Sequence, residues 1–208
     1  MAVKSFSKHR QPPRKAVFID KDGTLVEDLP YNVDPEQIRL MPDALRGAHV
    51  LHAAGYALIV ISNQSGVAHG YYDERALGGV ENRIRELLAC MNVPLTGFYY
   101  CPHHPEGRIA QYTRTCDCRK PAPGLILRAA REHDVNLARS WFIGDILHDI
   151  EAGHRAGCKT VLLDNGNETE WVYSPRRRPD WVVPDLVQAA CVITATDPIQ
   201  SGVYHQHG

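Results

Sequence analysis

One octapeptide constrains the fold of this 208-residue chain more than any other segment: residues 18–25 read FIDKDGTL. An apolar run, residues 16–19, leads directly into Asp20 and Asp22 and then into a Gly-Thr turn. Such a run suits a strand buried in a parallel sheet, and Gly23 allows the chain to turn sharply as it leaves. Both carboxylates would then stand at the carboxyl end of a strand, where open α/β sheets carry their active sites. The alternative is a surface turn rich in acids, since Asp-Gly is common in turns.

Strand-like and helix-like segments alternate along the chain. In residues 43–54 the apolar positions recur at helical spacing, and Gly55 is a stop signal. Alternation of this kind predicts an α/β fold, a three-layer, Rossmann-like, doubly wound arrangement with a mainly parallel sheet. The expected strands are residues 15–20, 56–62, 97–101, 140–144, 159–163 and 181–183, and the expected helices are residues 43–54, 73–90, 122–133, 147–156 and 185–192.

The length of the chain fits one substantial domain and is too short for two comfortable ones. We expect a flexible N-terminal arm at residues 1–14, one folded domain at residues 15–194 and a flexible C-terminal tail at residues 195–208. No internal repeat is present in the sequence.

The charge and hydropathy of the chain exclude several classes of partner. A net charge of -1 gives no electrostatic footprint for nucleic acid or for acidic membranes, and the basic run at residues 176–178 suits a solvated loop. The apolar stretch at residues 56–61 is far too short to span a bilayer, and the first fifteen residues do not resemble a signal peptide. We therefore expect a cytoplasmic monomer with no nucleic-acid or membrane partner.

Two further motifs carry groups that suit an anion. The strand-like segment 56–61 ends in Ser62 and Asn63, whose hydroxyl and amide can donate hydrogen bonds without adding charge. Later in the chain, Arg119 and Lys120 precede a proline-rich entry into a helix. Lys120 suits a point charge on a phosphate, and Arg119 suits a planar fork for phosphate or substrate hydroxyls. Taken singly, each motif is equally compatible with an ordinary polar loop or a solvated basic pair.

A third strand end carries another pair of acids, in residues 144–149, which read GDILHD. Asp145 ends a strand as Asp20 does, so it can complete an oxygen-rich magnesium site. Asp149 follows one helical turn later. It either contacts the metal or stabilises the first turn of the next helix, and the residues alone leave both alternatives open.

Three cysteines and a histidine lie close together in the sequence, as Cys101-Pro-His103 and Cys116-Asp-Cys118. Three thiolates and an imidazole form a closed, structural zinc set, although the one-residue spacing is tighter than that of a generic zinc finger. His104 competes as a ligand, but His103 pairs better with Cys101 on one turn. Buried free thiols are the alternative, whereas disulfides do not suit a cytosolic chain.

These motifs follow one order: strand-Asp-x-Asp-Gly-Thr, strand-Ser-Asn, Lys-Pro and strand-Gly-Asp-x-x-x-Asp. In this order they resemble the haloacid dehalogenase superfamily of aspartate-nucleophile phosphotransferases, over residues 15–190. The cysteine loop narrows the match. Residues 99–105, YYCPHHP, followed by residues 116–121, CDCRKP, are similar to the D-glycero-D-manno-heptose-1,7-bisphosphate 7-phosphatase family. Histidinol-phosphatase domains are near relatives of that family and share much of the pattern.

The resemblance implies a catalytic role for each matching residue. Asp20 would be the nucleophile that takes the phosphoryl group, and Asp22 the general acid that later acts as a base. Ser62 and Lys120 would stabilise the transferring phosphoryl group. Mg²⁺ would be held by Asp20, Asp145 and the backbone carbonyl of Asp22. The physics agrees, because a carboxylate that attacks a phosphate dianion needs that charge neutralised.

The resemblance also implies how the site is framed. Family members of this size lack a large cap domain, so short loops would surround the site, including the zinc-clasped loop. Zinc would act at a distance by fixing the backbone before Arg119 and Lys120. One departure is Ile146, because the family pattern often carries lysine after Gly-Asp. The small phosphorylated sugar substrate would contact Asp28, Tyr31, Asn63, Gln64, Ser65 and Arg119.

Other functions share parts of this pattern. Histidinol phosphate is the alternative substrate. A DNA 3′-phosphatase would need a basic groove that the near-neutral charge does not supply. A phospho-accepting signalling receiver also combines an aspartate, a lysine and Mg²⁺, but an acid/base such as Asp22 beside the nucleophile favours turnover. A zinc-binding interaction module without catalysis is disfavoured because every catalytic position is filled.

Overall fold

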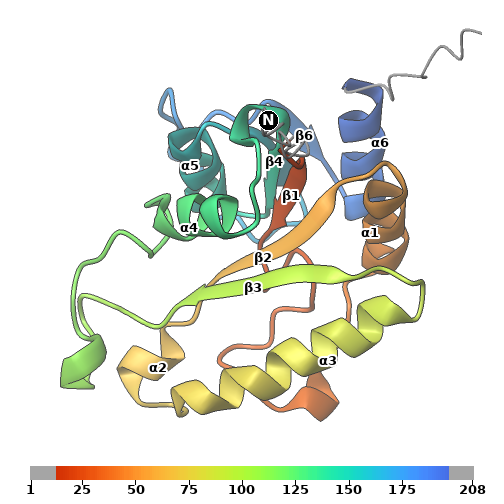
Figure 1. Ribbon diagram of the computed structural model, residues 1–208. Helices are drawn as coiled ribbons and strands as arrows, with labels where there is room; N and C mark the ends of the chain where they lie inside the picture. The colour runs from red at the N-terminus through yellow and green to blue at the C-terminus, as the bar shows by residue number, and fades with distance from the viewer. Residues whose placement is uncertain (1–12, 197–208) are drawn as a thin grey trace, which may run out of the picture.

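The structure, a computed structural model, describes residues 13–196. These residues form one six-stranded sheet in the order β3-β2-β1-β4-β5-β6, with every neighbouring pair parallel (Figure 1). The predicted parallel sheet and its six strands are confirmed. The strands are β1 (Ala16–Ile19), β2 (Ala57–Asn63), β3 (Leu95–Cys101), β4 (Trp141–Gly144), β5 (Lys159–Leu163) and β6 (Trp181–Val183).

Helices cover both faces of this sheet, which confirms the predicted three-layer α/β fold (Figure 1). In Figure 1, α1 and α6 lie side by side at one end of the molecule, and α4 and α5 lie on the opposite face. The helices are α1 (Ala44–Ala53), α2 (Gly66–His69), α3 (Leu77–Ala89), α4 (Gly124–Glu132), α5 (Leu147–Ala156) and α6 (Leu186–Thr196), and 3₁₀ turns occupy Pro35–Gln37, Glu74–Ala76, Ala110–Tyr112 and Leu137–Arg139.

The strand β1 is apolar at every position because helices cover both faces of the sheet at this strand. Val17 and Ile19 pack into the core beneath α1, α3 and α6, whereas Ala16 and Phe18 pack against α4 and α5. Consecutive side chains of a strand point to opposite faces of its sheet. A strand with apolar residues at every position therefore lies between two covered faces, as all four residues of β1 do.

The ends of several helices differ from the sequence predictions. The segment expected to be helical from residue 73 begins with a 3₁₀ turn, because Asp73 accepts from the backbone N–H of Arg75, and α3 itself starts at Leu77. The short helix α2 was not predicted, since four residues are too few to leave a periodic pattern. At the other end of the chain, α6 continues to Thr196, so residues 195 and 196 are helical rather than part of the predicted tail.

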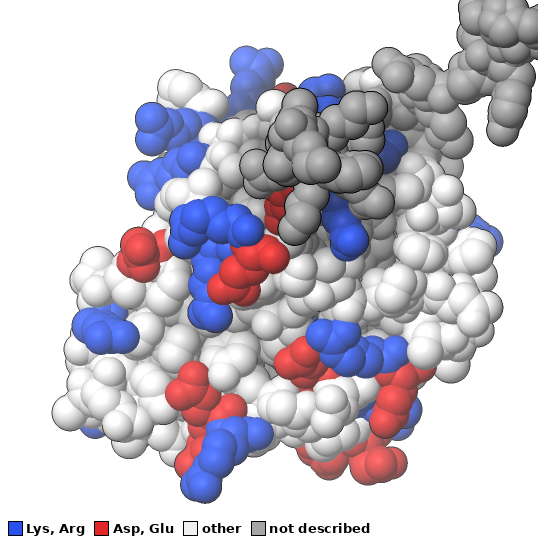
Figure 2. All heavy atoms as spheres, viewed as in Figure 1, with Lys and Arg blue, Asp and Glu red and all other residues white. Residues whose placement is uncertain are grey.

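The predicted terminal arms fall largely outside the described residues, which exclude residues 1–12 and 197–208. At the first described residues, the backbone of Arg14 donates to Asp134 and accepts from Asn136. None of the helices within residues 13–196 has both the length and the apolar character needed to cross a membrane. On the face drawn in Figure 2, basic and acidic side chains are interspersed, in keeping with the net charge of -1.

The order of the strands determines where a site can form. β1 lies at the centre of the sheet, with β2 on one side and β4 on the other, so the chain winds in opposite directions from this point. At such a switch point the connecting loops diverge and leave a crevice outside the carboxyl ends of the strands. Asp20 follows β1 and Asp145 follows β4, which brings both acids to this crevice.

Candidate active site at the carboxyl ends of the strands

Four buried charged side chains converge where β1 and β4 end. The ammonium group of Lys120 contacts Asp20 Oδ1 and lies 2.6 Å from Asp149 Oδ1. Asp145 joins them because β1 and β4 pair with Ile19 opposite Ile143. The four side chains belong to residues that are between 0% and 6% exposed. The structure therefore brings together three acids and one lysine that are far apart in the sequence.

The carboxylates of this cluster are crowded. One oxygen from each of Asp20, Asp145 and Asp149 lies within 4.8 Å of the others. Burial raises the pKa of Asp20 well above its usual range; Lys120 opposes this effect, and the charges of Asp149, Asp145 and Asp22 add to it. Burial, reinforced by the charge of Asp149, raises the pKa of Asp145 to about 6. A set of oxygen ligands carrying more negative than positive charge fits a hard divalent cation, whose charge would relieve the repulsion.

Of the two roles that the sequence left open for Asp149, the structure shows the stabilisation of the helix start, and it adds an ion pair that the sequence did not indicate. Its Oδ2 accepts from the backbone N–H of Ile146 at 3.3 Å, which caps the start of α5. Its Oδ1 meets the ammonium group of Lys120. One carboxylate thus stabilises the first turn of the helix and also belongs to the charged cluster.

The Gly-Thr turn after β1 packs directly against Asp145. Gly23 has a φ of +76°, and a Cβ at this position would lie 2.2 Å from Asp145 Oδ2. The hydroxyl of Thr24 donates to Asp145 Oδ1 at 3.1 Å. The absence of a side chain at residue 23 therefore lets the two acid-bearing segments approach each other, beyond the conformational freedom predicted from the sequence.

Asp22 is held by two donors that do not belong to this cluster. Lys21 Nζ lies 2.8 Å from Asp22 Oδ1, and Gln64 Nε2 donates to Asp22 Oδ2 at 3.1 Å. The same amide donates to Ser62 Oγ at 2.7 Å. The hydroxyl of Tyr72 donates to Gln64 Oε1 at 2.7 Å, which fixes the direction of the amide. Gln64, predicted as a substrate contact, thereby connects the end of β2 to Asp22.

A cavity of about 300 Å³ opens next to Asp22. Its wall includes the exposed ring of Tyr31, which packs edge-on against Tyr71 with ring centroids 4.5 Å apart. Five of the six predicted substrate contacts line this cavity, and Arg119 does not. The lining consists of Lys21, Asp22, Asp28, Pro30, Tyr31, Asn32, Asn63, Gln64, Ser65, Gly66 and Tyr72.

Besides Gln64, two further predicted substrate contacts bond to other parts of the protein. The guanidinium of Arg119 donates to the backbone carbonyl of His103 at 3.4 Å. The side chain of Asn63 bonds to both backbone groups of Lys120, accepting from its N–H at 3.0 Å and donating to its carbonyl at 3.2 Å. Asn63 therefore fixes the backbone of the lysine that carries the charge of the cluster.

Sequence reasoning missed several residues around the cluster. Lys21 lies inside the first motif, and its full burial beside Asp22 could have been suspected from that position. Tyr72 and Asn167 belong to loops without a recognisable motif. Asn167 Nδ2 donates to Asp145 Oδ2 at 2.7 Å, a contact between residues 22 positions apart. No periodicity or spacing in the sequence indicates such a contact.

The predicted zinc ligands also converge. Cys118 Sγ lies 3.0 Å from Cys101 Sγ, 3.2 Å from Cys116 Sγ and 3.3 Å from His103 Nδ1. Hydrogen bonds from Cys101 and Cys116, together with the nearby imidazole, lower the pKa of Cys118 to about 5 despite its burial. The cysteines are not joined by disulfides. Three sulfurs and one nitrogen around a common point fit the closed tetrahedral set that structural zinc takes.

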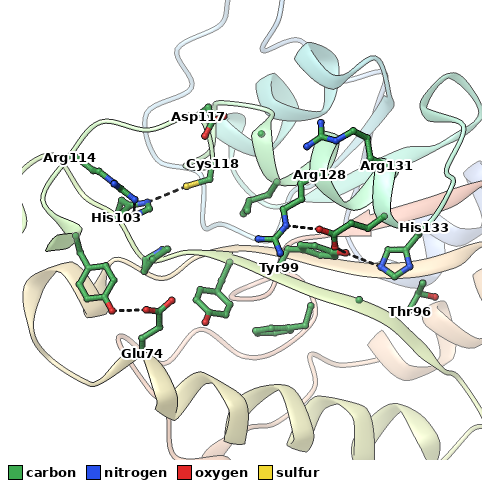
Figure 3. Close-up of a pocket in the computed structure, with 18 residues that line it drawn as sticks. Glu74, Thr96, Tyr99, His103, Arg114, Asp117, Cys118, Arg128, Arg131 and His133 are labelled. Carbon is green, nitrogen blue, oxygen red and sulfur yellow. Dashed lines mark hydrogen bonds and ion pairs between the residues drawn. The ribbon is translucent and has the colours of Figure 1, made fainter.

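A larger cavity, of about 840 Å³, lies along β3 and reaches this Cys/His cluster at His103 and Cys118. Figure 3 shows it between the strand and α4, with His103 and Cys118 at one end. Several of its polar side chains are paired with each other. The hydroxyl of Tyr99 donates to Glu132 at 2.6 Å, and Arg128 donates to the same carboxylate at 2.8 Å. None of the acids of the Lys120 cluster lines this cavity.

Comparison with known proteins identifies the class. The HAD-hydrolase-like family model matches residues 117–189. An HAD-like phosphatase from Mesorhizobium loti has a TM-score of 0.77 and 32% identity, with 88% of each chain covered. D,D-heptose 1,7-bisphosphate phosphatase from B. bronchiseptica, solved with magnesium and phosphate, has a TM-score of 0.71 and 28% identity, covering 88% of this chain and 99% of that one.

Sequence identity to proteins of known name identifies the family within this class. D-glycero-beta-D-manno-heptose-1,7-bisphosphate 7-phosphatase from Pasteurella multocida is 40% identical over 154 residues, 74% of this chain and 83% of that protein. The protein of the same name from Escherichia coli K12 is 35% identical over 172 residues, 82% of this chain and 89% of that protein. The chain therefore belongs to the HAD-like hydrolases and, within them, to the D-glycero-beta-D-manno-heptose-1,7-bisphosphate 7-phosphatase family.

Proposed function

We propose that this protein is a magnesium-dependent phosphatase that removes the C7 phosphate of D-glycero-D-manno-heptose 1,7-bisphosphate. One arrangement carries the proposal. A buried carboxylate, Asp20, is paired with Lys120 and followed two residues later by Asp22, which faces a cavity. The relatives of 33–40% identity, all named for this activity, support the substrate. The product would enter the synthesis of ADP- or GDP-activated heptose.

In the first step, one oxygen of Asp20 attacks the phosphorus atom. The bond between phosphorus and the C7 oxygen breaks, and Asp22 gives its proton to that leaving oxygen. The phosphoryl group is now bonded to Asp20 as an aspartyl phosphate. Asp22 suits proton transfer because its side chain is 32% exposed and faces the cavity where the leaving sugar would lie.

In the second step, water attacks the phosphorus atom of the aspartyl phosphate. Asp22, deprotonated by the first step, takes a proton from that water, and the bond to Asp20 breaks. Inorganic phosphate leaves, and both aspartates return to their starting states. Lys21 and Gln64, which both bond to Asp22, keep its carboxylate oriented toward the reacting atoms in both directions.

Negative charge is neutralised by groups that surround Asp20. Lys120 and the hydroxyl of Ser62 would stabilise the phosphoryl oxygens. A Mg²⁺ ion held by Asp20, Asp145 and the backbone carbonyl of Asp22 would supply further positive charge at the phosphate. The crowded oxygen ligands of the cluster support this assignment. Asp28, Tyr31, Asn63, Gln64, Ser65 and Arg119 would contact the sugar or its distal phosphate.

The enzyme would act as a cytoplasmic monomer, without nucleic-acid or membrane partners. Residues 15–194 would form its catalytic domain, and Zn²⁺ on Cys101, His103, Cys116 and Cys118 would hold the loop before Lys120.

The substrate can be tested with a panel of phosphate esters. We expect release of one phosphate from the α- or β-anomer of the heptose bisphosphate, with the C1 phosphate retained, which ³¹P NMR distinguishes directly. Histidinol phosphate, hydrolysed under the same conditions, is the comparison. Faster hydrolysis of histidinol phosphate than of both heptose anomers would contradict the proposed substrate but not the aspartate chemistry.

The zinc site can be tested with Cys116→Ser. The variant is expected to lose at least about tenfold in zinc affinity, because one of four ligands is replaced. Its rate should fall as well, since the loop that ends at Cys118 leads directly into Arg119 and Lys120. Metal content by mass spectrometry and the rate of phosphate release measure the two effects. Cys191→Ser, an exposed cysteine on α6, is the matched control. Full activity of a zinc-free enzyme would refute the role of the clasp.

A further inference from the structure

The loop that follows β5 returns to the carboxylate cluster at three points. Asn165 Nδ2 donates to the backbone carbonyl of Gly23 at 2.7 Å. Asn167 Nδ2 donates to Asp145 Oδ2 at 2.7 Å, and Glu168 Oε2 accepts from the backbone N–H of Leu147 at 2.7 Å. These contacts join the loop to the turn after β1, to the acid after β4 and to the start of α5. A segment without a recognisable motif thus touches three parts of the site.

Both oxygens of Asp145 accept from neutral donors. The hydroxyl of Thr24 donates to Oδ1, and the amide of Asn167 donates to Oδ2. The ammonium group of Lys120, in contrast, is shared by Asp20 and Asp149. Neutral donors orient a carboxylate without cancelling its charge, and each carboxylate oxygen keeps a second lone pair. Asp145 is therefore held in place while its full negative charge remains for a cation.

The residue beside Asp145 adds no charge of its own. Ile146, the next residue, is uncharged, and the side chains that donate to Asp145 are those of Thr24 and Asn167. Thr24 is fully buried in the turn, but Asn167 is an exposed loop residue. Loss of the Asn167 side chain would leave no void in the core. A substitution there changes the orientation of Asp145 and leaves the packed sheet intact.

We propose that Asn167 is a positioning residue that sets the affinity of the site for Mg²⁺ by fixing the carboxylate of Asp145. The proposal rests on the magnesium site of the proposed function. A ligand that is already oriented loses less conformational freedom when the ion binds, and partners that orient metal ligands are commonly worth a factor of about 10–100 in metal affinity or activity. Asn167 touches neither the substrate cavity nor Asp20 in the described residues.

The test measures Mg²⁺ binding directly, on the full chain without substrate. Asn167→Ala is expected to raise the dissociation constant for Mg²⁺, determined by calorimetric titration with magnesium chloride, by about tenfold. Thr169→Ala, an exposed neighbour on the same loop, is the control and should bind Mg²⁺ as the wild type does. With saturating Mg²⁺, kcat of Asn167→Ala should return close to the wild-type value.

Thermal unfolding separates this role from a purely structural one. In EDTA, the Tm of Asn167→Ala should equal that of the wild type, whereas the rise in Tm on adding Mg²⁺ should be smaller. An unchanged dissociation constant would overturn the proposal, whether or not the Tm in EDTA falls. If the wild-type chain itself bound no Mg²⁺, the magnesium site of the proposed function would fail, and the role of Asn167 would fail with it. If the wild-type chain bound Mg²⁺ but did not hydrolyse heptose bisphosphate, the proposed substrate would fail and the role of Asn167 in Mg²⁺ binding would stand.

Discussion

Asp20→Asn is expected to lower the rate of phosphate release by at least about 10³-fold, because an amide cannot serve as the nucleophile in place of a carboxylate. The two side chains have nearly the same size, so the buried position next to Lys120 remains filled. Stopped phosphate assays under saturating substrate measure the loss. Equal rates for the variant and the wild type would refute a mechanism through Asp20.

Asp22→Asn is the informative partner of this variant. It keeps the nucleophile but removes proton transfer, which the mechanism requires in both steps. We expect Asp22→Asn to slow release strongly while still permitting phosphoryl transfer to Asp20. Intact-protein mass spectrometry after acid quenching would then detect phosphorylated chain in Asp22→Asn and none in Asp20→Asn. Near-identical Tm values would show that both variants remain folded.

The convergence of Asp20 and Asp145 was predictable from the sequence. Each follows a short apolar strand, and the carboxyl ends of adjacent parallel strands meet at one edge of the sheet. The three layers were also predictable. Helical periodicity and continuous apolar strands both arise from burial, so together they indicate helices packed on both faces of a sheet. The Cys/His cluster was predictable because its ligands lie in two short, tightly spaced pairs.

Contacts that depend on the path of a loop were not predictable. Gln64 lines the cavity as a predicted substrate contact would, but the sequence did not indicate that its amide also donates to Asp22, with Tyr72 fixing the other end of that side chain. Arg119, another predicted substrate contact, does not line this cavity, and its guanidinium donates to the carbonyl of His103. In both cases the residue type was informative, whereas its direction depends on backbone turns that leave no periodic signal.

The order of the motifs carried more information than any single motif. Asp149 illustrates what a single motif leaves open, because a carboxylate one turn into a helix suits both a metal ligand and a stabiliser of the first helical turn. Only the position of Lys120, which enters from a loop 29 residues earlier in the chain, reveals that Asp149 both stabilises the helix start and pairs with an ammonium group. Side-chain roles that require two distant segments therefore need the structure.

Lys120→Met is expected to reduce both activity and stability, because it removes an ammonium group that contacts both Asp20 and Asp149. Methionine is also long and unbranched, so the variant changes charge more than volume. Removing one partner of a buried ion pair commonly costs about 3–5 kcal/mol in the free energy of unfolding. Loss of a charge that stabilises the phosphoryl group should lower kcat by about 10²–10³-fold.

The effect of Mg²⁺ on this variant distinguishes electrostatic repulsion from a packing defect. Without the lysine, the three buried carboxylates repel each other, so a divalent cation should raise the Tm of Lys120→Met more than that of the wild type. Thermal unfolding in EDTA and in Mg²⁺ measures this difference, with Lys159→Met as the control that removes an exposed lysine. An equal rise in Tm for Lys120→Met and the wild type would mean that packing, not charge, accounts for the lost stability. Because Mg²⁺ cannot replace an ammonium group on the phosphoryl oxygens, kcat should stay low even where the cation restores the fold.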